Sequence, residues 1–239
     1  MGRVVLVTGG TAGIGLSLAE AFLAEGASVV VCGRSRTALD RFGRAHPEAL
    51  AVQADVTVPA ARAALLDAIT DRFGRLDVLV NNAGTFVERD FAADDDATLA
   101  LDQEVDLNLT APIALTGEAL RRWAPLDAVV FVTSGFALVS PTRAPTYGAV
   151  KAGPHGFAEG LRRQLAPQGT HVLEVLPPTT DTPMNADTPG PKLAPAEVAA
   201  VTLRALRQRR PMALPGRTRM LPTMLRIAPH SLGRMVAEL

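Results

Sequence analysis

The segment TGGTAGIG occupies residues 8–15 and directly follows an apolar run at residues 4–7. The run is rich in valine and predicts a β-strand, and apolar residues at helical spacing from Ile14 onward predict a helix over residues 14–25. Glycines at such a strand-to-helix turn let backbone N–H groups approach a phosphate at the positive end of the helix. The spacing departs from the strict G-x-G-x-x-G pattern, and a glycine turn can also serve helix packing alone. The strand-to-helix context favours the phosphate-binding interpretation.

The same alternation of strand and helix continues along the chain. We expect further strands at residues 28–32, 50–53, 78–80, 128–132, 172–176 and 212–214, and further helices at residues 60–73, 107–123, 147–165 and 196–207. Strands separated by helices predict a doubly wound parallel sheet of the α/β class, with helices on both faces. Ligands of such sheets bind beyond the carboxyl ends of the strands, near the reversal of strand order.

Length and composition narrow the function classes. The 239 residues, 48% of them apolar, suit one packed domain over residues 1–239. Lys plus Arg and Asp plus Glu both number 24, so no net charge favours nucleic acid. The single cysteine, Cys32, and histidines without ligand spacing predict neither a disulfide framework nor a metal site. No apolar run reaches the roughly 18 residues of a membrane span and no export signal is evident, so we expect a cytoplasmic protein without stable membrane insertion.

Two regions interrupt the alternation. Residues 182–195 hold four prolines and Gly190, which predicts an irregular surface segment suited to a lid. Residues 217–239 carry a helical apolar stripe cut by Pro222 and Pro229, which predicts a broken helical tail. Its stripe residues are Leu221, Leu225, Ala228, Leu232, Met235 and Leu239. Three roles are open to the tail: to cover the substrate pocket, to complete a dimer or to touch a membrane surface. Packing on its own protein is the simplest expectation.

Tyr147 is the only tyrosine in the chain, and Lys151, four residues later, is one of only two lysines. Positions i and i+4 share a helix face, so the ammonium can lie near the phenol and favour its ionised form. A free phenol, with a pKa of about 10, is otherwise a poor proton-transfer group at neutral pH. The alternative is a partly buried aromatic beside a solvent-reaching lysine.

Polar residues follow two predicted strands at the same edge of the sheet. Ser134 comes after the strand at 128–132, where its hydroxyl can hydrogen-bond a substrate oxygen beside Tyr147. The sequence NNAG at residues 81–84 follows the strand at 78–80, although Asn and Gly also serve purely structural turns. Arg34 lies about 20 residues after the glycines, at the place where NAD-binding folds carry an acidic residue for the ribose hydroxyl. This chain has no acidic residue there. An arginine there suits the 2′-phosphate of NADP better than NAD, the alternative being an ordinary solvated cation.

Together, the glycine turn, the NNAG turn, Ser134 and the Tyr147-x-x-x-Lys151 pair resemble the short-chain dehydrogenase/reductase family over residues 3 to about 185. The resemblance implies a Rossmann-fold sheet of strand order 3-2-1-4-5-6-7, with Tyr147 as general acid or base and Ser134 holding the substrate carbonyl. It also implies that Lys151 lowers the pKa of the phenol and binds the nicotinamide ribose, and that Asn108 kinks a helix and supports a proton relay. The cofactor-binding residues expected besides Tyr147 and Lys151 are Gly9, Thr11, Gly13, Ile14, Gly15, Arg34, Asp55, Val56, Asn82, Ala83, Gly84, Pro177, Thr180 and Thr182.

The chain departs from the family pattern at two prolines. Pro178 stands where the family usually has glycine, which removes a backbone donor and stiffens that wall of the site. Pro154 lies inside the predicted helix at 147–165, where proline costs about 3 kcal/mol, so a kink there is expected. Because family members pack this helix across a subunit interface, the kink bears on whether the expected homo-oligomer is a dimer or a tetramer.

These observations predict an NADPH-dependent oxidoreductase that interconverts a hydrophobic ketone or enone and its alcohol. Mostly apolar residues after the strand ends are expected to line the substrate site, namely Phe86, Val87, Phe136, Leu138, Val139 and Met184. One alternative is a non-redox isomerase, dehydratase or cyclase that uses bound NADP(H) as a scaffold, for which Pro178 is the best support. Another is a non-catalytic redox sensor, which would not need Ser134, Tyr147 and Lys151 together.

Overall fold

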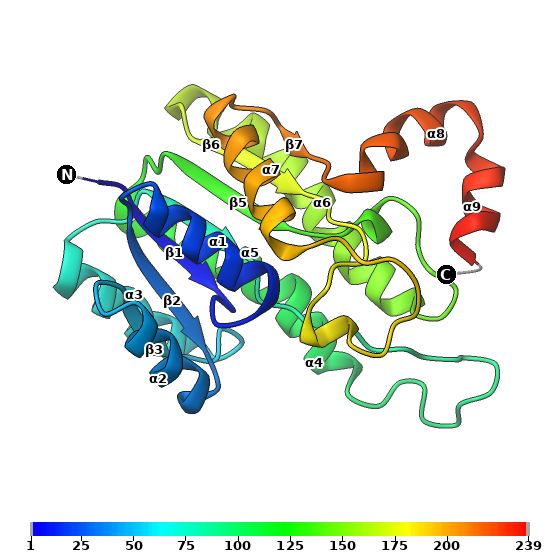
Figure 1. Ribbon diagram of the computed structural model, residues 1–239, viewed down its shortest axis with the longest axis horizontal. Coiled ribbons are helices and arrows are strands. Elements are labelled where there is room, and N and C mark those ends of the chain that lie inside the picture. Colours follow the sequence, from blue (N-terminus) through cyan, green and yellow to red (C-terminus); the bar gives the residue numbers. More distant parts are fainter. Residues whose placement is uncertain (1, 238–239) are drawn as a thin grey trace.

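A computed structural model describes residues 2–237 of the chain. In this range parallel strands form one sheet in the order β3-β2-β1-β4-β5-β6-β7, which confirms the expected topology (Figure 1). The strands are β1 (Val4–Thr8), β2 (Ser28–Gly33), β3 (Leu50–Gln53), β4 (Val78–Asn81), β5 (Ala128–Val132), β6 (His171–Val175) and β7 (Met212–Ala213). The strand order reverses between β1 and β4, so a ligand site is expected beyond the carboxyl ends of these two strands.

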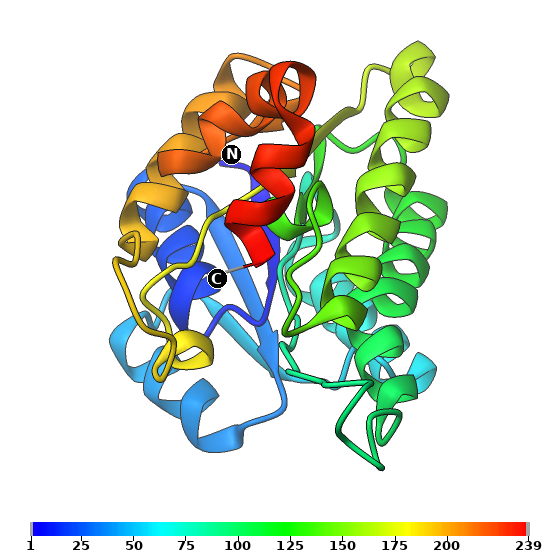
Figure 2. The same ribbon diagram turned by 90° about the vertical axis from the view of Figure 1, so that its right-hand side faces the viewer.

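Helices cover both faces of the sheet (Figure 2). The α-helices are α1 (Gly13–Ala24), α2 (Arg36–Ala45), α3 (Pro59–Phe73), α4 (Leu101–Val105), α5 (Ala111–Trp123), α6 (Pro145–Leu165), α7 (Pro195–Arg207), α8 (Leu221–Ile227) and α9 (Pro229–Ala237). A π-helical turn, η1 (Asp106–Thr110), joins α4 to α5, and 3-10 turns are η2 (Gly135–Ala137), η3 (Ala166–Gln168), η4 (Pro183–Asn185) and η5 (Gly216–Met220). None of the helices in the described range is long and apolar enough to cross a bilayer.

Alternating side chains of the strands build two separate cores. In β1, Val5 and Val7 pack in a core with α1, α2 and α7, whereas Val4 and Leu6 pack in the opposite core with α3, α5 and α6. This alternation follows from the two-residue period of a strand. Because both faces of β1 are buried, its sequence is a continuous apolar run rather than an alternating one.

The structure differs from the prediction in α2, in α4 and at the start of the helix around Asn108, whereas α6 forms where a helix was predicted. Helix α2 was not expected, because only Leu39 and Phe42 on it are buried and its apolar signal is short. The helix expected at 107–123 is divided at its start by η1, around Asn108. Helix α6 continues through Pro154, which is buried in its interior.

The polar turns named above meet at one edge of the sheet, beyond the carboxyl ends of β1, β4, β5 and β6 (Figure 1). The tail follows β7 as η5, α8 and α9 and lies beyond the same ends, where Leu232 and Val236 are buried. The tail thus forms two short helices that are separated at Ala228, and Leu239 of its stripe lies outside the described residues. The segment at 182–195 contains the turn η4 and a parallel bridge between Thr180 and Leu193.

Candidate active site

The glycine turn between β1 and α1 leaves no space for side chains. Gly9 and Gly13 have φ angles of +64° and +52°, a region that residues with a Cβ atom rarely adopt. A Cβ atom on Gly15 would lie 2.3 Å from the carbonyl oxygen of Gly9, and one on Gly13 would lie 2.8 Å from the Cγ2 atom of Thr182. The turn therefore presents bare backbone at the start of α1, as a bound pyrophosphate requires.

Thr8 and Asn82 lock this turn to the turn after β4. The Thr8 hydroxyl oxygen accepts hydrogen bonds from the backbone N–H groups of Asn82 (2.9 Å) and Ala83 (3.0 Å). The Asn82 amide donates to the Thr8 carbonyl oxygen at 2.8 Å. The sequence interpretation assigned no role to Thr8, although it belongs to the quoted segment. Its contacts show that the two turns form one rigid wall.

Gly84 brings Asn108 and Lys151 together. A Cβ atom at Gly84 would lie 2.7 Å from Asn108 Oδ1 and 3.2 Å from Lys151 Nζ, so only glycine fits between them. Lys151 is buried and donates a hydrogen bond to the Val132 carbonyl oxygen at 3.3 Å. Asn108 Nδ2 donates to the Thr85 carbonyl oxygen at 3.0 Å from the π-helical turn η1. The irregular helix expected around Asn108 is thus present.

Tyr147 lies in the first turns of α6, and its ring packs between two phenylalanines. Phe86 meets it edge to face at 4.9 Å between ring centroids, and Phe136 at 6.4 Å. Lys151 Nζ is 5.7 Å from the centroid of the Tyr147 ring. The Ser134 side chain lies near enough to the phenol to lower its pKa. The hydroxyls of Tyr147 and Ser134 therefore lie side by side, as a shared substrate oxygen would require.

The acidity of Tyr147 corrects one expectation. Burial raises the pKa of the phenol to about 12; the Ser134 side chain lowers it and the Glu104 carboxylate raises it further. Lys151 was expected to lower this pKa, but desolvation is the largest influence on the phenol and raises its pKa. Burial also lowers the pKa of Lys151 itself to about 8. At neutral pH the phenol is protonated, so the site holds a proton donor.

The cleft beside these residues collects most of the predicted site. The predicted residues that line it are Gly9, Gly13, Ile14, Gly15, Asn82, Ala83, Gly84, Ser134, Tyr147, Lys151, Pro177, Thr180 and Thr182. Asn108 lies directly behind Gly84. The bare glycine cradle and the hydroxyls along the opposite wall fit an extended dinucleotide, whose phosphates would lie on the α1 turn. Sequence reasoning missed Thr179, Pro183, Asn185 and Arg143, which also line the cleft but belong to no local motif.

Four predicted cofactor residues lie away from this cleft, near the ends of β2 and β3. They are Thr11, Arg34, Asp55 and Val56. Arg34 is exposed, and its backbone carbonyl accepts a hydrogen bond from Gln53 at 3.0 Å. Partial burial raises the pKa of Asp55, but hydrogen bonds from Thr57 and the Arg34 cation together hold it below its usual value. This end of the sheet is open to solvent and suits the outer part of a dinucleotide.

A polar network behind Ser134 was not predicted either. Glu174 is buried in β6, where its carboxylate accepts a hydrogen bond from the Thr133 hydroxyl at 2.7 Å and lies 2.8 Å from His155 Nδ1. Thr133 directly precedes Ser134, so the network fixes the backbone that presents the Ser134 hydroxyl. Within residues 2–237, no group of three or more His, Cys, Asp or Glu side chains is placed to hold a metal ion.

An apolar cavity of about 350 Å³ adjoins the cleft. Ser134, Phe136, Pro177, Pro178 and Thr179 line both spaces. The far wall of the cavity comes from the tail, through Met220, Leu221, Met224, Leu232, Met235 and Val236, with Arg217 at its side. Of the residues expected around a substrate, Phe86 and Met184 line the cleft, Phe136 both spaces and Val139 the cavity, whereas Val87 and Leu138 line neither.

The family of the chain follows from a comparison with known proteins. The family model of short chain dehydrogenases matches residues 3–191, and the chain belongs to this family. It is therefore an oxidoreductase of a family that uses nicotinamide cofactors.

Individual relatives agree with this assignment. The chain is 38% identical over 187 residues to the uncharacterized oxidoreductase DltE of Bacillus subtilis (strain 168), covering 77% of this chain and 73% of the relative. It is 35% identical over 197 residues to a putative ketoacyl reductase of Streptomyces coelicolor, with 77% and 73% covered. A short chain dehydrogenase from Burkholderia cenocepacia J2315, solved in complex with NADP, superimposes with a TM-score of 0.85 at 28% identity over 98% of this chain and 97% of that one.

Proposed function

We propose that this oxidoreductase uses NADPH to reduce a hydrophobic ketone or enone to its alcohol, and that it also catalyses the reverse oxidation. One observation carries the proposal: Ser134 and the adjoining Phe136 line both the glycine-turn cleft and the apolar cavity. A carbonyl group at Ser134 would therefore face the cofactor on one side, while its apolar substituents occupy the cavity on the other.

The chain's own residues supply the proton and the orientation. When bound, reduced NADP supplies a hydride to the carbonyl carbon. The Ser134 hydroxyl donates a hydrogen bond to the carbonyl oxygen, and the protonated Tyr147 phenol gives its proton to the same oxygen as the C=O π bond becomes an O–H bond. Lys151, buried beside the phenol, stabilises the phenolate left behind, which solvent reprotonates through the region of Asn108.

The preference for NADP rests on Arg34. Its guanidinium is exposed, its backbone is held by Gln53, and no acidic residue occupies the adjacent position 33 that would bind a free ribose hydroxyl. A guanidinium can bind the 2′-phosphate with two parallel hydrogen bonds. The NADP complex of the Burkholderia relative supports the same choice.

The preference for an apolar substrate rests on the cavity. Its wall consists mostly of leucine, valine, methionine, phenylalanine and proline side chains, and the polar side chains among its described residues are Ser134, Thr179, Thr218 and Arg217. A cavity of about 350 Å³ lies within the range of small-molecule sites, so it suits a ring system or a medium-length chain. Flexible methionines allow the wall to adapt to several shapes.

A ketone and enone panel with NADPH tests the proposal. We expect loss of NADPH absorbance with apolar ketones, one alcohol formed per NADPH consumed, and much slower turnover with NADH. Arg34→Gln should reduce the advantage of NADPH over NADH. Isomerised or dehydrated product without NADPH consumption would refute the redox assignment and favour the scaffold alternative.

A further inference from the structure

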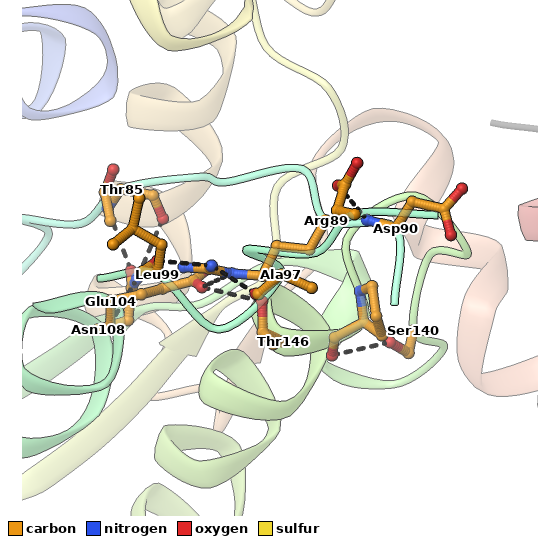
Figure 3. A network of polar contacts seen from close by, with 11 residues as sticks. Thr85, Arg89, Asp90, Ala97, Leu99, Glu104, Asn108, Ser140 and Thr146 are labelled. Carbon is orange, nitrogen blue, oxygen red and sulfur yellow. Dashed lines mark hydrogen bonds and ion pairs between the residues drawn. The ribbon is translucent and has the colours of Figure 1, made fainter. Parts of the chain in front are cut away.

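A buried ion pair connects the loop over residues 85–100 to the active site. Glu104 is 1% exposed and Arg89 is 6% exposed, and Arg89 Nε lies 3.3 Å from Glu104 Oε2. Arg89 Nη1 also donates to the carbonyl oxygens of Ala97 and Leu99, both at 2.7 Å. Figure 3 shows the Arg89 side chain extending toward Glu104, which lies near Asn108 and Thr146 (Figure 3).

Glu104 contacts segments that each carry a residue of the site. Its carboxylate accepts a hydrogen bond at 2.9 Å from Thr146, the residue next to Tyr147. Its backbone carbonyl accepts one at 3.1 Å from the Asn108 amide. Through Arg89 it holds the loop that carries Phe86, whose ring packs on Tyr147. The Glu104 side chain thus links the start of α6 to the loop, and the backbone of the same residue is tied to Asn108 in η1.

Stability alone does not explain this pair. Burying two charges costs several kcal/mol per ion, and well-packed apolar residues in their place are often as stable or more so. Two of the buried polar atoms, Arg89 Nη2 and Glu104 Oε1, have no hydrogen-bond partner within residues 2–237, so the pair is not fully compensated. An incompletely compensated charge pair beside a reacting group indicates a role in that group's chemistry.

We propose that Glu104 is a positioning residue for Tyr147, holding the phenol in place through Thr146 and presenting a fixed negative charge to it that Arg89 keeps buried. This inference rests on the proposed role of Tyr147 as proton donor. The charged groups around the phenol are Glu104 from α4, Lys151 from α6 and Arg143 from the segment before α6, whose guanidinium stacks at 5.0 Å on the Phe86 ring. Of these three groups only Glu104 is negatively charged. Its charge opposes ionisation of the Tyr147 phenol, which therefore remains a proton donor.

The single tyrosine of the chain makes this proposal directly measurable. Ultraviolet difference titration of the cofactor-free protein reports the ionisation of Tyr147 alone, because no other phenol is present. Glu104→Gln keeps the shape and the acceptor for Thr146, but it removes the anion and leaves the Arg89 cation unpaired. Both changes favour the phenolate, so the phenol should titrate roughly one pH unit lower than in the wild type.

The matched control is Glu88→Gln in the same loop. Glu88 pairs with Arg143, but its side chain is 56% exposed, so the same chemical change should leave the titration unmoved. In NADPH-dependent reduction, Glu104→Gln should lower kcat roughly tenfold with little change in KM for NADPH, because loss of the Arg89 pair loosens the loop that packs Phe86 on Tyr147 and leaves the cofactor cleft intact. Circular dichroism on each variant establishes that it is folded.

Glu104→Asp keeps the test decisive if the glutamine variant does not fold. It retains the charge but is one methylene too short to reach both Thr146 and Arg89, so kcat should fall severalfold while the phenol titrates as in the wild type. Any of three results would overturn the proposal. They are a wild-type kcat in Glu104→Asp, an unshifted Tyr147 titration in folded Glu104→Gln, and a Tyr147 titration that shifts equally in Glu88→Gln. If the wild-type protein reduces no ketone, the proposed function fails, while the titration still decides the effect of Glu104 on the phenol.

Discussion

The two spaces that meet at Ser134 are built in different ways. The cleft is walled mainly by backbone and side chains of the turns that follow β1, β4, β5 and β6, together with Tyr147 and Lys151 of α6. The cavity is walled by long apolar side chains, about half of them from the tail after β7. The cleft has geometry that allows little substitution, whereas the cavity can change its shape by exchanging one side chain for another. This contrast teaches that one fold can keep its cofactor chemistry while its substrate changes.

The largest effect on cofactor binding should come from a substitution that crowds the glycine turn of the cleft. Gly15→Ala would place a methyl group 2.3 Å from the Gly9 carbonyl oxygen, so the glycine turn must open. We expect the Kd for NADPH to rise roughly 10- to 100-fold, since overpacking costs about 1–3 kcal/mol and 1.4 kcal/mol is tenfold in binding. Fluorescence titration of NADPH measures the change.

The control for this variant is Gly43→Ala. Gly43 lies in α2 with no atom within 4 Å of an added Cβ, so NADPH binding should be unchanged and the helix slightly more stable. Unchanged affinity in folded Gly15→Ala would show that the turn does not cradle the cofactor.

A smaller effect, on substrate binding, is expected from a substitution in the wall of the apolar cavity. Met224→Trp in α8 fills part of the apolar cavity and should raise KM for bulky ketones about tenfold, since the loss of a pocket contact is worth about 1–3 kcal/mol. Small ketones and the Kd for NADPH should be unaffected. Ile227→Trp makes the same kind of change on the same helix at a side chain that is 78% exposed, and it should alter neither constant. Equal losses for small and bulky ketones would contradict a substrate role for the cavity.

The smallest effect, on the pH dependence of stability, concerns the amino end of β6, away from the cleft and the cavity. Burial lowers the pKa of His171 at the start of β6 below its ordinary value of 6.5, and the Arg209 and Arg162 cations lower it further. As the pH falls, His171 therefore takes up a proton in the unfolded chain at a higher pH than in the folded protein. The stability present above pH 6.5 is lost between pH 6.5 and the lower pKa of His171 in the folded protein.

Thermal denaturation at several pH values tests this linkage. His171→Gln should show a shallower loss of stability on acidification than the wild type, with unchanged NADPH affinity. His230→Gln, at an exposed position in α9, should keep the wild-type slope. A slope that is the same in His171→Gln and the wild type would contradict the effect of burial.

The contrast between the two spaces also explains what sequence reasoning found. The strands and most cleft residues were predictable because each cleft turn is local: a β-branched run, a polar or glycine turn and a helix follow one another in the chain. The strand order came from the family resemblance. Thr180 and Thr182 were found by resemblance in the same way. The tail was predicted as a broken apolar helix, but the cavity that it shares with Ser134 arises only from the fold.

Buried charge was the main feature that sequence reasoning missed. Arg89 and Glu104 are separated by an irregular loop, and nothing in their local sequence distinguishes them from solvated residues. The burial of Glu174 in β6 could not be predicted either, because its partners Thr133 and His155 come from other parts of the chain. The acidity of Tyr147 was misjudged for the same reason: the i,i+4 lysine is visible in sequence, whereas the desolvation of the phenol is not.

The most direct test of the central claim compares the wild type with Tyr147→Phe in NADPH-dependent reduction of the best ketone of the panel. The account predicts that kcat falls by about 10²- to 10⁴-fold, the usual worth of a positioned proton donor, while the Kd for NADPH stays within about twofold. The ring and its contacts with Phe86 and Phe136 remain in this variant, so the hydroxyl alone is tested. A variant that binds NADPH and reduces the ketone as fast as the wild type would contradict the account.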